Sequence, residues 1–122
     1  MCLLRPRFTH KEPYLVNMSD FQIALSTCGD RETAERIAHR LVEQRLAACV
    51  NILPGVQSIY QWRGAVQSES EVLVVIKTKA PLIQEVQSTI ASLHSYEVPE
   101  FLVLPILGGS EAYMAWLEAS LG

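Results

Sequence analysis

A nearly continuous run of apolar residues in the middle of the chain places the strongest limit on its fold. The run extends from Glu71 to Thr78, and every position from 72 to 76 is Val, Leu or Ile. Alternation of apolar and polar residues would indicate a strand with one face in water, whereas a continuous run is typical of a strand covered on both faces. We therefore expect a central strand here, in a sheet that needs cover on two sides.

The segments before this run predict a strand, a helix and a second strand. Residues 21–26 alternate loosely, as in a first strand, which breaks at Gly29-Asp30. Asp30 is a good N-cap, and the apolar residues after it recur at three- and four-residue steps, as in an amphipathic helix. A long strand is predicted over 49–62, with a bulge or bend at Pro54-Gly55. Residues 62–65 predict the turn into the central strand.

The segments after the run predict a second helix, a fourth strand and a last short helix. Pro81 suits the first turn of the second helix, in which apolar residues recur at helical spacing up to Leu93. The fourth strand is predicted over Val98 to Ile106. The Gly-Gly pair at 108–109 ends it, and Ser110 can cap the last helix.

The resulting order, β-α-β-β-α-β-α, indicates the fold class. A chain of 122 residues fits one domain with a single core. Two βαβ halves joined in this way give a four-stranded antiparallel sheet with both main helices on one face. The predicted fold is α+β, a ferredoxin-like βαββαβ sandwich with an extra C-terminal helix. Because the strands are apolar on both sides, we expect other subunits to cover the open face.

The first residues differ from the rest of the chain and are predicted to lie outside the domain. Residues 1–19 are interpreted as an N-terminal extension, and residues 20–122 as the domain. Two Arg, one Lys and two Pro occur before Met18, without the apolar core of a secretory signal. Met18 is either the natural start or preceded by a loose arm. The alternative is an additional ordered strand through residues 14–16.

Composition argues against several classes of partner and compartment. The net charge is −3 and the ten Lys and Arg residues are scattered, whereas nucleic-acid-binding domains usually carry a basic stripe. No apolar stretch approaches the roughly 20 residues that a membrane span needs. Three cysteines at wide spacing form neither a CxxC pair nor a disulfide framework, so a reducing compartment is expected. We expect no nucleic acid and no membrane as partners.

Several short motifs, in this order, resemble the CutA family of divalent-cation tolerance proteins. They are Leu-Ala-Ala-Cys-Val-Asn-Ile at 46–52, Pro-Gly-Val at 54–56, Leu-His-Ser-Tyr-Glu-Val-Pro-Glu at 93–100 and Tyr-Met-Ala-Trp-Leu at 113–117. The resemblance implies a tight homotrimer whose architecture resembles that of the PII regulatory proteins. It also implies a cytoplasmic location and a link to copper and other divalent metals. The chain departs from the family pattern at Ser95, where Pro is frequent, and at Ser26, where some members have Cys.

Three residues are candidate metal ligands because soft thiolate and imidazole groups suit copper. They are Cys28, Cys49 and His94. The predicted topology brings Cys28 and His94 to one end of the sheet and Cys49 to the other, so a shared site needs neighbouring subunits. Two alternatives are open: Cys49 is a core residue, and His94 is a structural cap where a helix meets a loop.

A second candidate site is a cleft between subunits. Its residues offer aromatic walls and charges of both signs: Trp62, Lys77, Tyr96, Glu97 and Glu100. A cleft of this kind would bind a small ligand or an unidentified protein partner. The alternative is that Trp62 anchors the trimer and that Tyr96-Glu97 only turns the chain.

Catalytic motifs do not stand out in the sequence. Neither GxSxG, nor a P-loop, nor HExxH, nor a Cys-His-Asn pattern is present. An acylphosphatase-like hydrolase would need an Arg in the loop after the first strand, whereas Arg31 lies in the predicted start of the helix. We therefore expect a non-enzymatic, metal-binding trimer of copper tolerance. The alternative hypothesis is a PII-like trimeric signalling or scaffold module.

Overall fold

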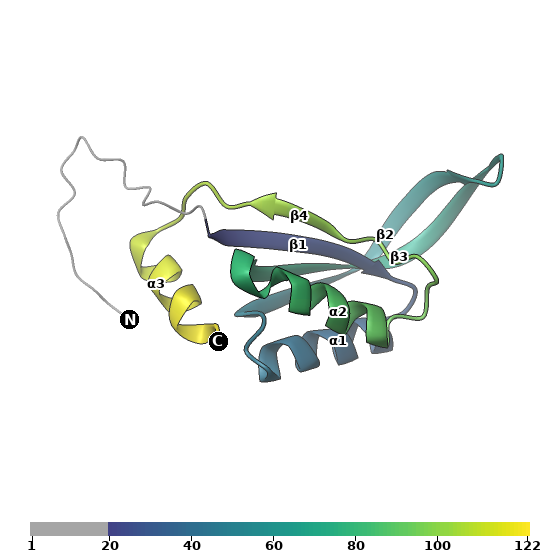
Figure 1. Ribbon diagram of the computed structural model, residues 1–122. Coiled ribbons are helices and arrows are strands. Elements are labelled where there is room, and N and C mark those ends of the chain that lie inside the picture. The colour runs from purple at the N-terminus through teal and green to yellow at the C-terminus, as the bar shows by residue number, and fades with distance from the viewer. Residues whose placement is uncertain (1–19) are drawn as a thin grey trace.

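The computed structural model describes residues 20–122 and folds them into one sheet with helices beside it (Figure 1). The elements follow in the order β1 (Phe21–Cys28), α1 (Arg31–Glu43), β2 (Cys49–Trp62), β3 (Ala65–Lys79), η1 (Ala80–Leu82), α2 (Ile83–Leu93), β4 (Leu102–Pro105) and α3 (Glu111–Ser120). This order confirms the predicted one, with a short 3₁₀ turn added before α2. The predictions for the N-terminal extension concern residues outside the described range.

The sheet has the strand order β2-β3-β1-β4, and each neighbouring pair is antiparallel. β3 is central, as the apolar run predicts, because β1 and β2 flank it. Figure 1 shows α1 and α2 together on one face of the sheet. The α+β prediction of a four-stranded antiparallel sheet with both main helices on one side is confirmed. The trimer stays a prediction.

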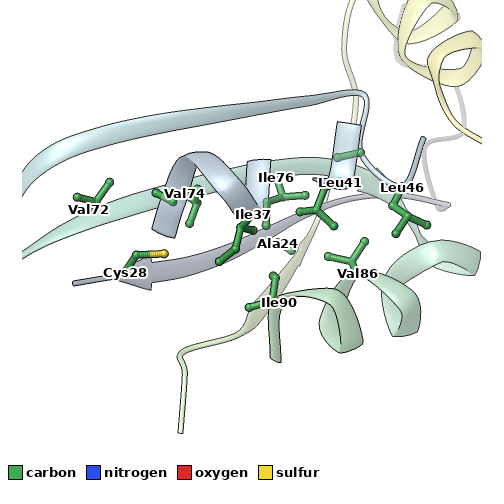
Figure 2. Packing of buried hydrophobic residues seen from close by; sticks show 12 residues of the cluster. Ala24, Cys28, Ile37, Leu41, Leu46, Val72, Val74, Ile76, Val86 and Ile90 are labelled. Atoms are coloured by element: carbon green, nitrogen blue, oxygen red, sulfur yellow. The ribbon is translucent and has the colours of Figure 1, made fainter. Parts of the chain in front are cut away.

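The main core lies between the sheet and these two helices (Figure 2). Val74 and Ile76 of β3 are fully buried against Ile37 and Leu41 of α1 and Ile90 of α2. Asp30 caps α1 as predicted: its carboxylate accepts a hydrogen bond from the Thr33 amide at 2.7 Å. Capping and the apolar stripe together explain why α1 begins at residue 31 and lies on the sheet.

The last helix packs at the end of the sheet where β1 begins. Ser110 caps α3 as predicted, accepting from the Tyr113 amide at 3.2 Å. Met114 and Leu117 of α3 are buried in a second, smaller hydrophobic cluster with Ala48. At its C-terminal end, α3 is held by the Arg45 guanidinium, which donates to three backbone carbonyls of residues 119–121.

The hairpin of β2 and β3 is longer than the sequence predicts. β3 begins at Ala65 and not at Glu71, and it pairs with β2 as far as Trp62 opposite Ala65. The expected turn is present, and Arg63 and Gly64 both have positive φ, as the tight hairpin turn requires. The prediction missed residues 65–70 because this arm is mostly polar and is held by backbone pairing, without a buried face. Figure 1 shows the hairpin projecting beyond β1.

The bulge in β2 and the length of β4 were also predicted from the sequence. The predicted bulge is confirmed, because the register shifts between Leu53 and Val56, and Gly55 there has φ 79°. The fourth strand covers only Leu102–Pro105, so the predicted range of 98–106 is too long. Pairing with β1 spans only Leu102 to Pro105, and Pro99, near the predicted start, lacks the amide that a ladder needs.

The face of the sheet opposite α1 and α2 carries apolar side chains. Residues that alternate with the core positions of the strands point to this open face. Leu53, Leu102 and Leu104 lie on it with 43%, 55% and 46% of their surface exposed. We call these residues, together with Leu25 and Val75 between them, the open face. Among residues 20–122, no helix is long and apolar enough to cross a membrane.

Candidate functional site

Cys28, the first of the predicted metal ligands, is the last residue of β1, and its thiol is fully buried. It lies opposite Val72 of β3 and packs in the main core. Burial raises the pKa of the Cys28 thiol to about 11, and the Asp30 and Glu71 carboxylates add to the effect. The thiol is therefore protonated at neutral pH, and the thiolate is the form that binds metals.

His94 ends α2 and joins it to β1. The His94 amide donates to the Ile90 carbonyl at 2.9 Å, and the ring Nε2 lies 2.6 Å from the Thr27 carbonyl oxygen. The other ring nitrogen, Nδ1, accepts a hydrogen bond from the Tyr96 amide at 3.0 Å. An amide can only donate, so Nδ1 is the unprotonated nitrogen and Nε2 carries the proton that Thr27 accepts. Both ring nitrogens therefore have protein partners.

Tyr96 extends this chain of contacts to β3. Its hydroxyl donates to Glu71 Oε2 at 2.8 Å, and its ring centroid lies 4.6 Å from that of His94. Glu71 is only 8% exposed, so this hydrogen bond satisfies a buried carboxylate. Burial and the neighbouring Glu71 raise the pKa of the Tyr96 hydroxyl, which keeps it protonated as a donor.

We call this connected group of His94, Tyr96 and Glu71, with the Thr27 carbonyl, the clasp. A further hydrogen bond beside it, from Ser26 Oγ to the Glu100 carbonyl at 2.8 Å, ties the far end of the same loop to β1. The roles of Glu71, Thr27 and Ser26 were not predicted from the sequence. A carboxylate at the start of an apolar strand was the one available signal, because such a residue needs a partner when the sheet buries it.

Cys49 lies at the opposite end of the sheet, as the topology predicts. It pairs with Lys77 of β3, five residues from Val72, so it stands about 17 Å from Cys28 along the strand. Cys49 is partly exposed on the edge strand, with its Sγ 3.9 Å from Asn51 Oδ1. Within residues 20–122 no three His, Cys, Asp or Glu side chains come together as a metal site.

The five residues of the predicted cleft are spread along one chain. Trp62 is at the hairpin tip and 53% exposed, whereas Tyr96 is in the clasp. Lys77 lies toward the other end of β3, where its Nζ is 3.3 Å from the Tyr113 hydroxyl. Glu97 and Glu100 follow the clasp in the loop before β4. A cleft made of all five residues would need more than one subunit.

The remaining candidates lie on the solvent side of α1. Arg31 forms an exposed ion pair with Glu35 at 2.9 Å and occupies the first turn of α1, as the sequence predicts. Two open hollows of about 380 and 390 Å³ follow the same helix and share Glu35 and His39. Neither hollow is lined by a residue of the clasp, although one of them reaches Leu93, the neighbour of His94. Neither hollow is lined by a residue predicted from the sequence to bind a metal or a ligand.

Known proteins resemble this chain over nearly the whole described range. The family model of the CutA1 divalent ion tolerance protein matches residues 22–120. The chain belongs to the CutA1 family. The divalent-cation tolerance protein CutA of Thermus thermophilus is 43% identical over 101 residues, which are 83% of this chain and 98% of that relative.

Other relatives of the CutA1 family differ in length. The chloroplastic CutA protein of Arabidopsis thaliana is 46% identical over 94 residues, which are 77% of this chain but 52% of that relative. The chain thus spans about half the length of the plant protein. Among solved structures, CutA from Synechococcus elongatus superposes with a TM-score of 0.83 at 38% identity, covering 88% of this chain and 96% of that one. The family resemblance inferred from the motifs is confirmed.

Proposed function

We propose that this protein is a cytoplasmic, homotrimeric divalent-cation tolerance protein that binds copper weakly and catalyses no reaction. The family supports the link to divalent cations. The apolar open face carries the assembly part of the proposal, since leucines exposed by 43% to 55% gather on one side of the sheet. Exposed patches of this kind mark protein interfaces. Free thiols at Cys28 and Cys49 suit a reducing compartment.

The copper site in this proposal is built between subunits around Cys49. This thiol is partly exposed, whereas the Cys28 thiol is buried and protonated and His94 has both ring nitrogens bonded. One chain offers no group of three ligands within residues 20–122. A thiolate is a soft ligand that suits copper, so Cys49 is the ligand expected from each subunit. Cys28 or His94 would join only after local rearrangement.

Native mass spectrometry of the reduced full chain, with and without a modest excess of copper, tests this function. We expect a trimer that takes up about one copper per chain, the stoichiometry that follows if each site takes the Cys49 thiol of one subunit and its other ligands from a neighbouring subunit. Cys49→Ser should abolish uptake, and Cys28→Ser is the matched control that should retain it. A monomer contradicts the assembly, and a trimer that stays metal-free contradicts the copper proposal.

A second candidate function is a PII-like scaffold or signalling module that binds a ligand or a protein partner between subunits. The observation that favours it is the projecting hairpin, which exposes 53% of Trp62 and 68% each of Ile59 and Val66. Trp62→Ala separates two roles of this hairpin. Loss of the trimer indicates an anchor, whereas an intact trimer that no longer shows thermal stabilisation by inorganic phosphate indicates a cleft that binds anions.

A further inference from the structure

We infer that His94 is a positioning residue, which holds the loop of residues 94–101 against β1 and β3, and that it is not a metal ligand in the folded chain. The metal part of this inference rests on the proposed function, while the positioning part stands on the metal-free structure. The first reason is the state of the imidazole. A neutral imidazole has one unprotonated nitrogen with which to bind a metal, and in His94 that atom is Nδ1.

The hydrogen-bond partner of Nδ1 decides whether His94 can bind a metal. A proton on Nε2 that points to a backbone carbonyl is common in metal-bound histidines, so the contact with Thr27 alone would be compatible with a ligand. Nδ1, however, accepts the Tyr96 amide at 3.0 Å. A metal at Nδ1 would displace this amide and leave it without a partner in a partly buried position. Coordination through Nε2 would instead remove the partner of the Thr27 carbonyl, in a residue only 6% exposed.

The second reason to assign a positioning role to His94 is that the clasp connects three separate segments of the chain. His94 places the Tyr96 backbone, and the Tyr96 side chain then reaches Glu71 at 2.8 Å. Glu71 pairs with Val56 directly after the bulge, at the base of the projecting hairpin. The imidazole therefore links the end of β1, the loop after α2 and the base of the hairpin. These are the segments that carry Glu97, Glu100 and, at the hairpin tip, Trp62.

The third reason is that the space around the clasp is closely filled. A Cβ built on Gly29 would stand 3.1 Å from the Tyr96 hydroxyl oxygen and 3.4 Å from the nearest ring carbon. Tyr96 thus lies directly over the chain between β1 and α1. A displacement of Tyr96 would take the hydroxyl donor away from the buried Glu71 carboxylate. The clasp is a fully paired polar network, and removing one member leaves other buried groups unpaired.

The test compares three variants of the reduced full chain: His94→Ala, His94→Asn and, as control, His39→Ala on the exposed side of α1. Asn keeps an oxygen acceptor near the position of Nδ1 but is a poor copper ligand. Hydrogen–deuterium exchange without metal reports the loop, and native mass spectrometry reports copper uptake. We expect exchange over residues 94–101 to rise at least tenfold in His94→Ala and less in His94→Asn. Copper uptake should remain in His94→Asn, and His39→Ala should match the wild type in both measurements.

Two results would overturn the inference. Unchanged exchange in His94→Ala would show that the imidazole does not position the loop. Loss of copper from His94→Asn, while its loop exchanges as in the wild type, would make His94 a ligand. If the wild-type protein takes up no copper, the copper proposal fails by itself, and the exchange measurement still decides whether His94 positions the loop.

Discussion

Arg45 has an unusual backbone conformation. Replacing it by Gly or by Ala separates the cost of this conformation from the stabilising hydrogen bonds of its side chain. It follows the C-cap of α1 with φ 58°, in the left-handed region that favours glycine. Its amide donates to the Val42 carbonyl at 3.0 Å, and the Leu46 amide donates to the Leu41 carbonyl at 2.9 Å. This pair of bonds is the Schellman ending of a helix, with Arg at the position that Gly usually occupies.

The side chain of Arg45 offsets this strain. Its guanidinium donates to the carbonyls of Ala119 at 2.8 Å and Leu121 at 3.1 Å, at the negative end of α3. Because the contacts are largely exposed, we assign about 1.5 kcal/mol to them together. The left-handed conformation costs about 1 kcal/mol more for Ala than for Gly. Arg45→Ala should therefore lose about 1.5 kcal/mol of unfolding free energy, and Arg45→Gly only about 0.5 kcal/mol.

Urea unfolding followed by circular dichroism measures both variants, at one fixed protein concentration because assembly affects apparent stability. Hydrogen exchange of α3 adds a local readout, which should rise in both variants because both lose the guanidinium. Equal stability of Arg45→Ala and Arg45→Gly would refute the argument from backbone strain. Wild-type exchange of α3 in both variants would refute the argument from the side-chain contacts.

Three further predictions concern the buried end of β1. Gly29→Ala should lower the unfolding free energy by about 1 kcal/mol, since its new methyl group meets the Tyr96 hydroxyl at 3.1 Å, and an unchanged urea midpoint would contradict this. Iodoacetamide with peptide mapping should label Cys49 in the folded protein and Cys28 only after denaturation, and rapid native labelling of Cys28 would show that its burial is wrong. The pKa of Cys28 is raised to about 11 from an ordinary 9.0, so its contribution to stability is complete below pH 9 and is lost as the pH rises toward 11. The free energy of unfolding, obtained from thermal unfolding curves at pH values between 9 and 11, should therefore fall more steeply with pH in the wild type than in Cys28→Ala. The difference in slope is at most about 1.4 kcal/mol per pH unit, and equal slopes in the two proteins would exclude the effect.

The sequence predicted the elements well where their signals are local. The caps at Asp30 and Ser110, the turn at Arg63-Gly64 and the bulge after Leu53 depend on residues close together in the chain. Each of these predictions is confirmed. The polar arm of the hairpin at 65–70 gave no periodic signal, because backbone pairing with β2 holds it, and so its strand was missed.

The candidate site was less accessible to sequence reasoning. The topology correctly placed Cys28 and His94 at one end of the sheet and Cys49 at the other. Whether His94 is a ligand or a cap depends on the partners of its two nitrogens. One of these partners is 67 residues away in the chain, and no spacing rule predicts such a contact.

By itself the sequence determined the order and type of the elements, the family and the apolar character of both sheet faces. These properties follow from periodicity, capping and motifs, which act over a few residues. Only the tertiary structure decided that His94, Tyr96 and Glu71 form one hydrogen-bonded clasp, and that Arg45 holds α3. Apart from the bond between the Tyr96 amide and His94, these contacts join groups 25 to 76 residues apart, and they form only when packing brings those groups within about 3 Å in a definite orientation.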